Sequence, residues 1–108
     1  MPTQSDRILR IDIFTVPEPA RADFLARVSA THAVLQRQAG FRLDRIVERK
    51  ADRGESRFLT IVEWEIEAVI PAAIAAVKAA HAADGFSSAE FMRDNGIVAD
   101  LGFYQPVA

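Results

Sequence analysis

Residues 57–66 limit most strongly how this chain can fold, because both faces of the stretch carry apolar side chains. The stretch is rich in β-branched and aromatic residues and contains neither Gly nor Pro, which is typical of a strand. Successive side chains of a strand point to opposite faces. One face therefore holds Trp64 with Phe58, Thr60 and Val62, and the other holds Leu59 and Ile61. We expect both faces to be covered.

Composition excludes several classes of function. The chain has 108 residues, a net charge of −2 and no cysteine. The length indicates one domain, residues 1–108. Without cysteine there is no disulfide, thiolate nucleophile or sulfur-ligated metal. A slightly acidic chain lacks the basic surface that nucleic acids and anionic membranes require, and Glu63 and Glu65 disfavour RNA binding by the third strand.

The N-terminus and the apolar runs indicate where in the cell the protein is expected. Residues 1–6 are polar rather than a signal peptide, and no apolar run approaches the roughly 20 residues that span a bilayer. We expect a cytoplasmic protein with no membrane and no nucleic-acid partner.

Three more strands are predicted from alternation of apolar residues. Residues 8–16 have one clean apolar face, formed by Leu9, Ile11 and Ile13. Residues 41–50 place Phe41, Leu43 and Val47 on one face around Arg45, and a turn at residues 52–55 joins them to the Trp64 strand as a hairpin. Residues 97–104 form the last strand.

Two long helices and a short one are predicted between these strands. Residues 20–38 carry the apolar stripe Leu25, Val28, His32 and Leu35, and residues 67–83 carry Ile70, Ile74, Val77 and His81. Gly40 and Gly85 are placed to end the two helices. Ser87 and Glu90 form a capping box that starts a short helix to residue 94.

The order of elements predicts the fold class. Two strand–helix–strand units joined by a hairpin give an α+β, ferredoxin-like fold: a four-stranded antiparallel sheet with both long helices on one face. The other face of the sheet then carries apolar side chains without cover. Pairing two such sheets face to face would cover them, so we expect a homodimer.

Three parts of the chain resemble the antibiotic biosynthesis monooxygenase family. These are the sequence LTIVEW at residues 59–64, His81 near the end of its helix, and the tail GFSSAEFMRDNGIVADLGFYQPV at residues 85–107. With the order of elements, the resemblance extends over residues 8–106. It implies a dimeric α/β barrel. Some members oxidise activated aromatic substrates, such as anthrones or quinols, with O₂ and no bound cofactor, and others degrade haem.

The haem-degrading branch uses an Asn on the first strand, a Trp at the end of the third strand and a His on the next helix. Trp64 matches the Trp, and His81 lies on the corresponding helix, several residues late. Residues 8–16 contain no Asn. The chain also has no Gly-rich phosphate-binding fingerprint and no metal-ligand spacing. We therefore expect no haem, flavin or metal cofactor.

Three residues are the candidates for catalysis. His81 and His32 lie on the apolar stripes of the two long helices, where a neutral imidazole could take a proton from a phenol or an anthrone carbon. The alternative is a buried histidine bonded to the backbone. Trp64 could stack on a planar ligand or could be an ordinary core residue.

Four further residues are candidates for binding the substrate. Phe58 shares the face of Trp64, and Arg45 interrupts an apolar strand face as an anion anchor or a snorkelling side chain. Tyr104 and Asn95 could donate hydrogen bonds to a substrate oxygen. Their alternatives are a strand-edge tyrosine and a helix cap.

Three functions remain open on the sequence. The first is a cofactor-independent monooxygenase acting on a small activated aromatic. The second is a non-catalytic dimeric α/β-barrel protein that binds a hydrophobic metabolite, as in a stress response. The third is an isomerase of the muconolactone type, which needs a base but no oxygen.

Overall fold

The computed structural model describes residues 4–107 and contains the elements in the predicted order. The strands are β1 (Ile8–Pro17), β2 (Phe41–Lys50), β3 (Glu55–Trp64) and β4 (Val98–Tyr104). The helices are α1 (Arg21–Leu35), α2 (Ile70–Ala83) and α3 (Ser88–Asp94). Short 3₁₀ turns precede three of these elements: η1 (Gln4–Asp6) before β1, η2 (Glu18–Ala20) before α1 and η3 (Glu67–Val69) before α2.

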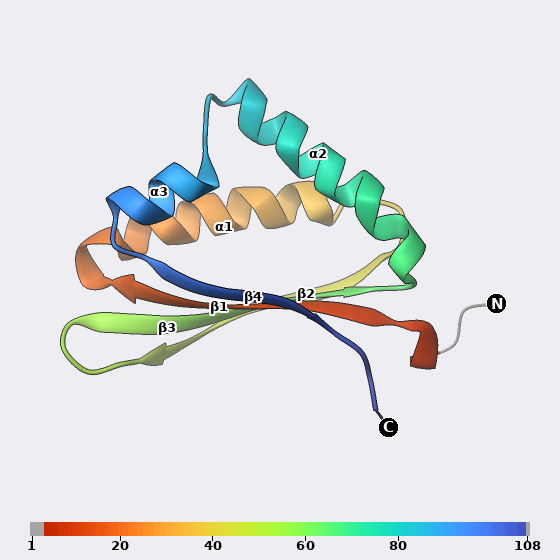
Figure 1. Cartoon of the computed structure of the whole chain (residues 1–108), viewed down its shortest axis with the longest axis horizontal. Helices are drawn as coiled ribbons and strands as arrows, with labels where there is room; N and C mark the ends of the chain where they lie inside the picture. The colour runs from red at the N-terminus through yellow and green to blue at the C-terminus, as the bar shows by residue number, and fades with distance from the viewer. Residues whose placement is uncertain (1–3, 108) are drawn as a thin grey trace.

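The four strands form one antiparallel sheet in the order β2-β3-β1-β4, and the helices lie together on one face (Figure 1). This is the predicted ferredoxin-like α+β fold. The central pair β1 and β3 is in register from Ile8 opposite Trp64 to Pro17 opposite Glu55. α1 lies along the sheet, whereas α2 rises away from it towards its C-terminal end (Figure 1).

Both long helices are shorter than predicted. A 3₁₀ turn that includes Pro19 precedes α1, and another precedes α2, whose first turn contains Pro71. Proline is accepted there because the first amides of a helix have no partner to lose. α1 ends at Leu35, and turns lead from it to Gly40, which has a φ of +84°. The last predicted turn of this helix is therefore not helical.

α3 begins and ends with side-chain caps. The Ser87 hydroxyl accepts a hydrogen bond from the Glu90 amide at 3.2 Å, as the capping-box pattern predicts. At the other end, the side-chain amide of Asn95 donates to the Phe91 carbonyl at 2.8 Å. These caps stabilise a helix of only seven residues.

The buried core is divided into two clusters. The first contains Trp64 with Ile8, Val62, Ile70 and Ala73, where α2 begins. The second contains Phe58 with Val16, Ala20, Phe24 and Ile97, where α1 begins. Because Phe58 and Trp64 lie six residues apart on β3, the clusters occupy opposite ends of the sheet face. Polar residues occupy the space between them.

The face of β1 that meets the helices carries both charged and apolar side chains. The residues with side chains on that face include Arg10, Asp12 and Phe14, which pair with Val62, Thr60 and Phe58 of the buried face of β3. The clean apolar face of Leu9, Ile11 and Ile13 lies on the side of the sheet without helices. We call this side the open face.

Two sequence expectations about side-chain direction are wrong. A β-bulge between Phe41 and Leu43 puts Phe41 on the helix side, against Trp64, while Leu43 stays on the open face. On α2, Ala73 rather than Ile74 is buried, and Ile74 is 42% exposed. The small side chain of Ala73 allows the start of α2 to lie close to the sheet.

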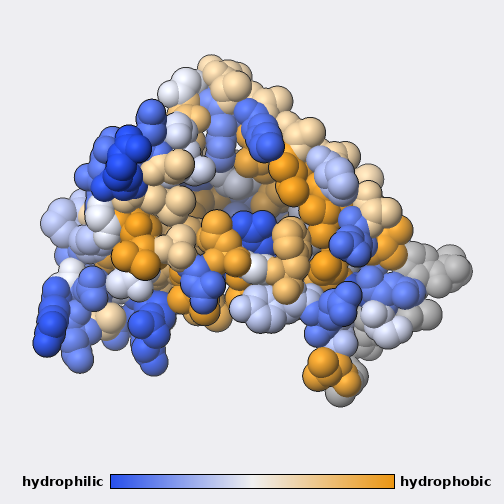
Figure 2. Space-filling model, in the orientation of Figure 1, coloured by the Kyte–Doolittle hydropathy of each residue, from blue (hydrophilic) through white to orange (hydrophobic). Residues whose placement is uncertain are grey.

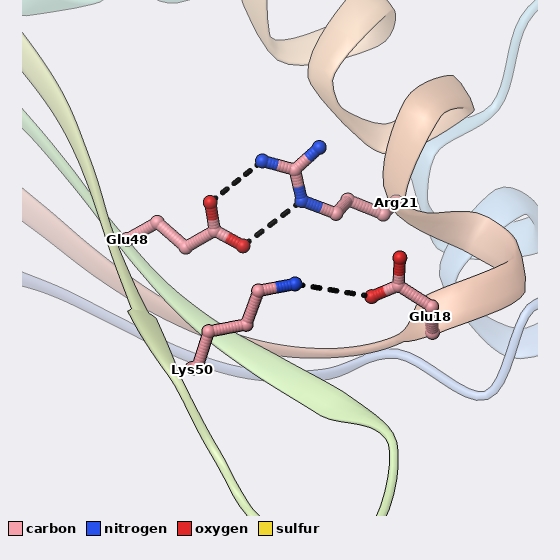
Figure 3. A network of polar contacts seen from close by, with 4 residues as sticks. All are labelled: Glu18, Arg21, Glu48 and Lys50. Carbon is pink, nitrogen blue, oxygen red and sulfur yellow. Dashed lines mark hydrogen bonds and ion pairs between the residues drawn. The ribbon is translucent and has the colours of Figure 1, made fainter.

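Ion pairs tie the start of α1 to the edge strand β2 (Figure 3). Arg21 donates two hydrogen bonds to the Glu48 carboxylate, at 2.6 and 2.9 Å, and Lys50 lies 3.6 Å from Glu18. The hydrogen bonds from Arg21 lower the pKa of Glu48 to about 2.

Within residues 4–107, no single helix is long and apolar enough to cross a membrane. One bent pair, Glu67–Ala83 with Ser88–Asp94, meets the length and composition criteria together.

Candidate functional site

Two adjoining cavities lie between the helices and the sheet. The inner cavity, of about 240 Å³, is enclosed by α1, α3 and the middle of the sheet. The outer cavity, of about 370 Å³, lies between α2 and the sheet at the Trp64 end. Figure 2 shows the surface hollowed between the helices and the sheet, with polar residues inside the hollow and apolar residues around it. A space of this kind is the usual form of a small-molecule site.

His32 lines the inner cavity and is held by a carboxylate. The residue is 6% exposed, and its Nδ1 lies 2.9 Å from Oδ2 of Asp44 on β2. The same oxygen accepts a hydrogen bond from the Gln36 side-chain amide, also at 2.9 Å. Burial raises the pKa of Asp44, but the hydrogen bonds from Gln36 and His32 outweigh this, so the pKa of Asp44 is lowered. The ionised carboxylate favours the tautomer that carries its proton on Nδ1, which leaves Nε2 as the proton acceptor.

His81 of α2 lines both cavities. Its Nε2 lies 3.1 Å from the Thr31 hydroxyl of α1, and its ring meets that of Phe86 edge-on at 5.0 Å. The guanidinium of Arg27, on α1, lies 4.0 Å from the centre of the Phe86 ring. His81 is thus placed by contacts with α1 and the loop after α2.

A charged pair from β1 forms the sheet side of both cavities. Arg10 donates a hydrogen bond from Nε to a carboxylate oxygen of Asp12, and its guanidinium lies 5.0 Å from the centre of the Phe103 ring. Burial raises the pKa of Asp12, and the Arg10 hydrogen bond only partly offsets this. Asp12 and His32 both line the inner cavity.

Trp64 lines the outer cavity and belongs to the first core cluster. It is 3% exposed and packs edge-on against Phe41, with ring centres 6.0 Å apart. Its ring therefore serves both the core and the cavity wall. His32 and Trp64 line different cavities, and His81 is shared by the two.

The four predicted substrate-binding residues lie away from the two cavities. Phe58 is 1% exposed inside the second core cluster. Arg45 pairs with Ile61 and Tyr104 with Leu9, which places both on the open face. Asn95 caps α3. For Asn95 and Tyr104 the geometry matches the alternatives that the sequence left open, a helix cap and a tyrosine on an edge strand.

Four residues of the site were not predicted: Arg10, Asp12, Thr31 and Asp44. The sequence alone indicates that Arg10, Asp12 and Asp44 are charged strand residues that are exposed to solvent or form cross-strand ion pairs. A signal was available, because Arg10 and Asp12 share a strand face with apolar Ile8, Phe14 and Val16. No cluster of three or more potential metal ligands occurs in residues 4–107.

Comparison with known proteins shows the fold but no close relative. No protein-family model and no curated protein matches the chain. Among solved structures, SnoaB, a cofactor-independent oxygenase from Streptomyces nogalater, is 22% identical over 95% of both chains, with a TM-score of 0.68. A protein from Nitrosomonas europaea, described as a candidate antibiotic biosynthesis monooxygenase, is 14% identical over 99% of this chain and 96% of its own, with a TM-score of 0.68.

A haem-degrading protein from Mycobacterium tuberculosis is also similar in structure. It is 16% identical over 94% of this chain and 95% of its own, with a TM-score of 0.59. These matches confirm that the chain has the fold of the family that its sequence resembles. At such identities the likeness establishes the fold alone.

Proposed function

We propose that this chain is a cofactor-independent monooxygenase that oxidises a small activated aromatic, of the quinol or anthrone type, with O₂. The observation that carries the proposal is the His32–Asp44 pair, with Nδ1 and Oδ2 2.9 Å apart, whose imidazole lines a mostly apolar cavity. A carboxylate-oriented imidazole is a common general base. The shared fold with an oxygenase described as cofactor-independent supports the same conclusion.

The residues can perform this chemistry without a bound group. Nε2 of His32 takes a proton from the acidic carbon of an anthrone, and the electron pair stays on the ring as a carbanion. O₂ adds to that carbon. The imidazolium returns its proton to the resulting peroxide, and loss of the second C–H proton with cleavage of the O–O bond then leaves a ring carbonyl and releases water. Asp44 stabilises the imidazolium between these steps, while the apolar walls hold the ring.

Haem fits the described residues less well than a small aromatic substrate does. Nε2 of His81, on the helix where the resemblance places the haem-degrading histidine, is engaged by Thr31 at 3.1 Å. The first strand presents the Arg10–Asp12 pair to the cavities in place of an Asn. No step of the proposed reaction uses haem.

A second copy of the chain is the proposed cover for the open face. Leu43, Val47, Val98 and Tyr104 are each between 43% and 69% exposed on that face, beside the half-buried apolar residues of β1 and β3. Monomeric proteins rarely expose contiguous apolar surface of this kind. Sheet-to-sheet pairing of two copies would bury it and give a closed barrel.

Oxygen uptake tests the proposed activity. The purified protein is incubated with 1,8-dihydroxyanthrone while O₂ consumption and formation of the anthraquinone are recorded. We expect one O₂ per quinone formed, and a loss of roughly 10²–10⁴-fold in rate for His32→Gln, because a general base contributes about that much. His81→Ala tests the other histidine in the same way. Asp52→Asn, in the exposed hairpin turn, is the matched control.

The outcomes separate the alternatives. Substrate conversion without O₂ uptake would indicate an isomerase. Binding with no conversion, unchanged by His32→Gln, would indicate a non-catalytic binding protein. Either result contradicts the monooxygenase proposal.

A further inference from the structure

The inner and outer cavities meet at a group of shared residues, most of them polar. Four of the five polar residues that line both spaces form two pairs, Arg10 with Asp12 from β1 and Thr31 from α1 with His81 from α2, and the fifth is Ser88 of α3. The first pair belongs to the sheet and the second to the helices. Each pair is internally bonded, through the Arg10–Asp12 hydrogen bond and the 3.1 Å Thr31–His81 contact. We call these four residues the polar waist.

Apolar walls extend from the waist in both directions. The inner cavity ends in Phe14, Phe24, Phe91 and Met92, which belong to or pack on the second core cluster. The outer cavity ends in Trp64, Ile70 and Ala73 of the first core cluster. The division of the core into two clusters is therefore also a division of the site into two apolar lobes with a polar middle.

The waist is a selective hydrogen-bonding environment. An ionised Asp12 only accepts hydrogen bonds, and its carboxylate already accepts one from the Arg10 side chain and one from the Gly102 backbone. Burial disfavours the charge of this carboxylate, which is why its pKa is raised. The Asp12 side chain is still 16% exposed. A hydroxyl group brought to a remaining lone pair would replace the hydrogen bond of the water that it displaces, whereas an ether or a hydrocarbon would displace that water without replacing its hydrogen bond.

We infer that the two cavities form one bilobed site for an elongated planar apolar molecule with a hydroxyl group near its middle, and that Asp12 determines this specificity by accepting that hydroxyl hydrogen. The inference rests on the proposed function for the identity of the site and narrows its substrate class. Trp64 stands against the end of the molecule in the outer lobe. Arg10 is a positioning residue, because it fixes the Asp12 carboxylate.

Binding of isomeric phenanthrols tests the waist directly. 9-Phenanthrol carries its hydroxyl on the central ring, 2-phenanthrol carries it on an end ring, and 9-methoxyphenanthrene lacks the donor. Titrations are followed by quenching of Trp64, the single tryptophan of the chain, under argon so that no oxidation occurs. We expect 9-phenanthrol to bind about tenfold or more tightly than either analogue, as a hydrogen bond to a charged acceptor allows.

Three variants assign the preference to Asp12. Asp12→Val should abolish the preference for 9-phenanthrol, and Asp12→Asn, which keeps the shape and a neutral acceptor, should reduce it to about threefold or less. Asp52→Asn removes an exposed carboxylate and should leave the preference unchanged. Thermal melts confirm that each variant is folded, and Asp12→Asn decides the matter if Asp12→Val does not fold.

Equal affinities for the three compounds in the unaltered protein would overturn the inference. So would a preference that survives in a folded Asp12→Val variant. These results do not depend on turnover. A preference for the central hydroxyl without O₂ uptake would support the role of Asp12 and refute the proposed oxygenase activity. O₂ uptake without this preference would support the oxygenase activity and refute the role of Asp12.

Discussion

Replacement of Gly40 by Ala tests how closely the turn after α1 must approach the segment that follows Trp64. A Cβ at Gly40 would lie 2.6 and 2.8 Å from the two methyl carbons of Val69 and 3.0 Å from its Cβ. The carbonyl of Gly40 also accepts a hydrogen bond from the Glu65 amide at 2.8 Å. Gly54 provides a matched control, since its φ of +75° is similar and nothing lies within 4 Å of the added Cβ.

The two substitutions share one cost and differ in another. At both positions a left-handed backbone costs an alanine about 1–2 kcal/mol, partly offset by about 0.4–1 kcal/mol from the stiffer unfolded chain. At Gly40 the added methyl group also collides with Val69, and overpacking of this kind costs about 1–3 kcal/mol. Rotation of Val69 does not relieve the collision, because three of its side-chain carbons lie within 3.0 Å. Gly40→Ala should therefore lower the free energy of unfolding by about 1–3 kcal/mol more than Gly54→Ala.

Urea unfolding followed by Trp64 fluorescence measures both free energies. In thermal melts the difference should appear as a Tm about 4–8 °C lower for each kcal/mol. Compared with Val69→Ala alone, adding Gly40→Ala to it should cost less than Gly40→Ala costs in the unaltered protein, since the two shortest contacts are removed and only the Cβ contact at 3.0 Å remains. Equal destabilisation by Gly40→Ala and Gly54→Ala would refute the reasoning, as would an equal cost of Gly40→Ala with and without Val69→Ala.

Three further outcomes are expected. The pKa of Asp44 is lowered in the folded protein, so its contribution to stability is complete above its unfolded pKa of ~4 and is lost as the pH falls through its folded pKa. Between about pH 5 and pH 3, the Asp44→Asn variant should therefore lose less stability than the unaltered protein, as measured by urea unfolding at each pH. Arg21→Gln should raise the pKa of Glu48 from about 2 towards its ordinary value, as followed by NMR titration of the carboxyl carbon. Val98→Asp, on the open face where Val98 is 69% exposed, should convert a dimer to a monomer in light scattering, and a monomer mass for the unaltered protein at micromolar concentration would contradict the proposed pairing.

The alternation of apolar residues was sufficient to predict the sheet and its connections. Each strand was found within two residues of its predicted bounds, because turns with Gly, Pro and Asp separate strands that alternate clearly. Side-chain direction was less predictable on β2. The bulge that turns Phe41 towards Trp64 cannot be predicted from the local sequence, because it depends on how β2 pairs with β3.

The site was harder to predict because the helix-facing side of β1 is not the more apolar one. Leu9, Ile11 and Ile13 make a clean stripe, and a single chain would be expected to bury it. The helices cover Arg10 and Asp12 instead, since the core is split into two clusters with a polar space between them. Helix periodicity did bring His32 and His81 to the cavities, because that signal depends only on spacing along one element.

The strand order has a consequence for how the chain folds. β1 is the first strand in the sequence and lies in the interior of the sheet, yet both of its neighbours come much later, β3 from residue 55 and β4 from residue 98. Only the β2–β3 hairpin can close locally, since loop closure across long separations is entropically costly. Until the hairpin presents an edge, Ile8 to Pro17 have no backbone partners on either side. The polar pair on β1 is therefore placed opposite α1 and α2 only after β1 has joined the hairpin, which is a non-local step of folding.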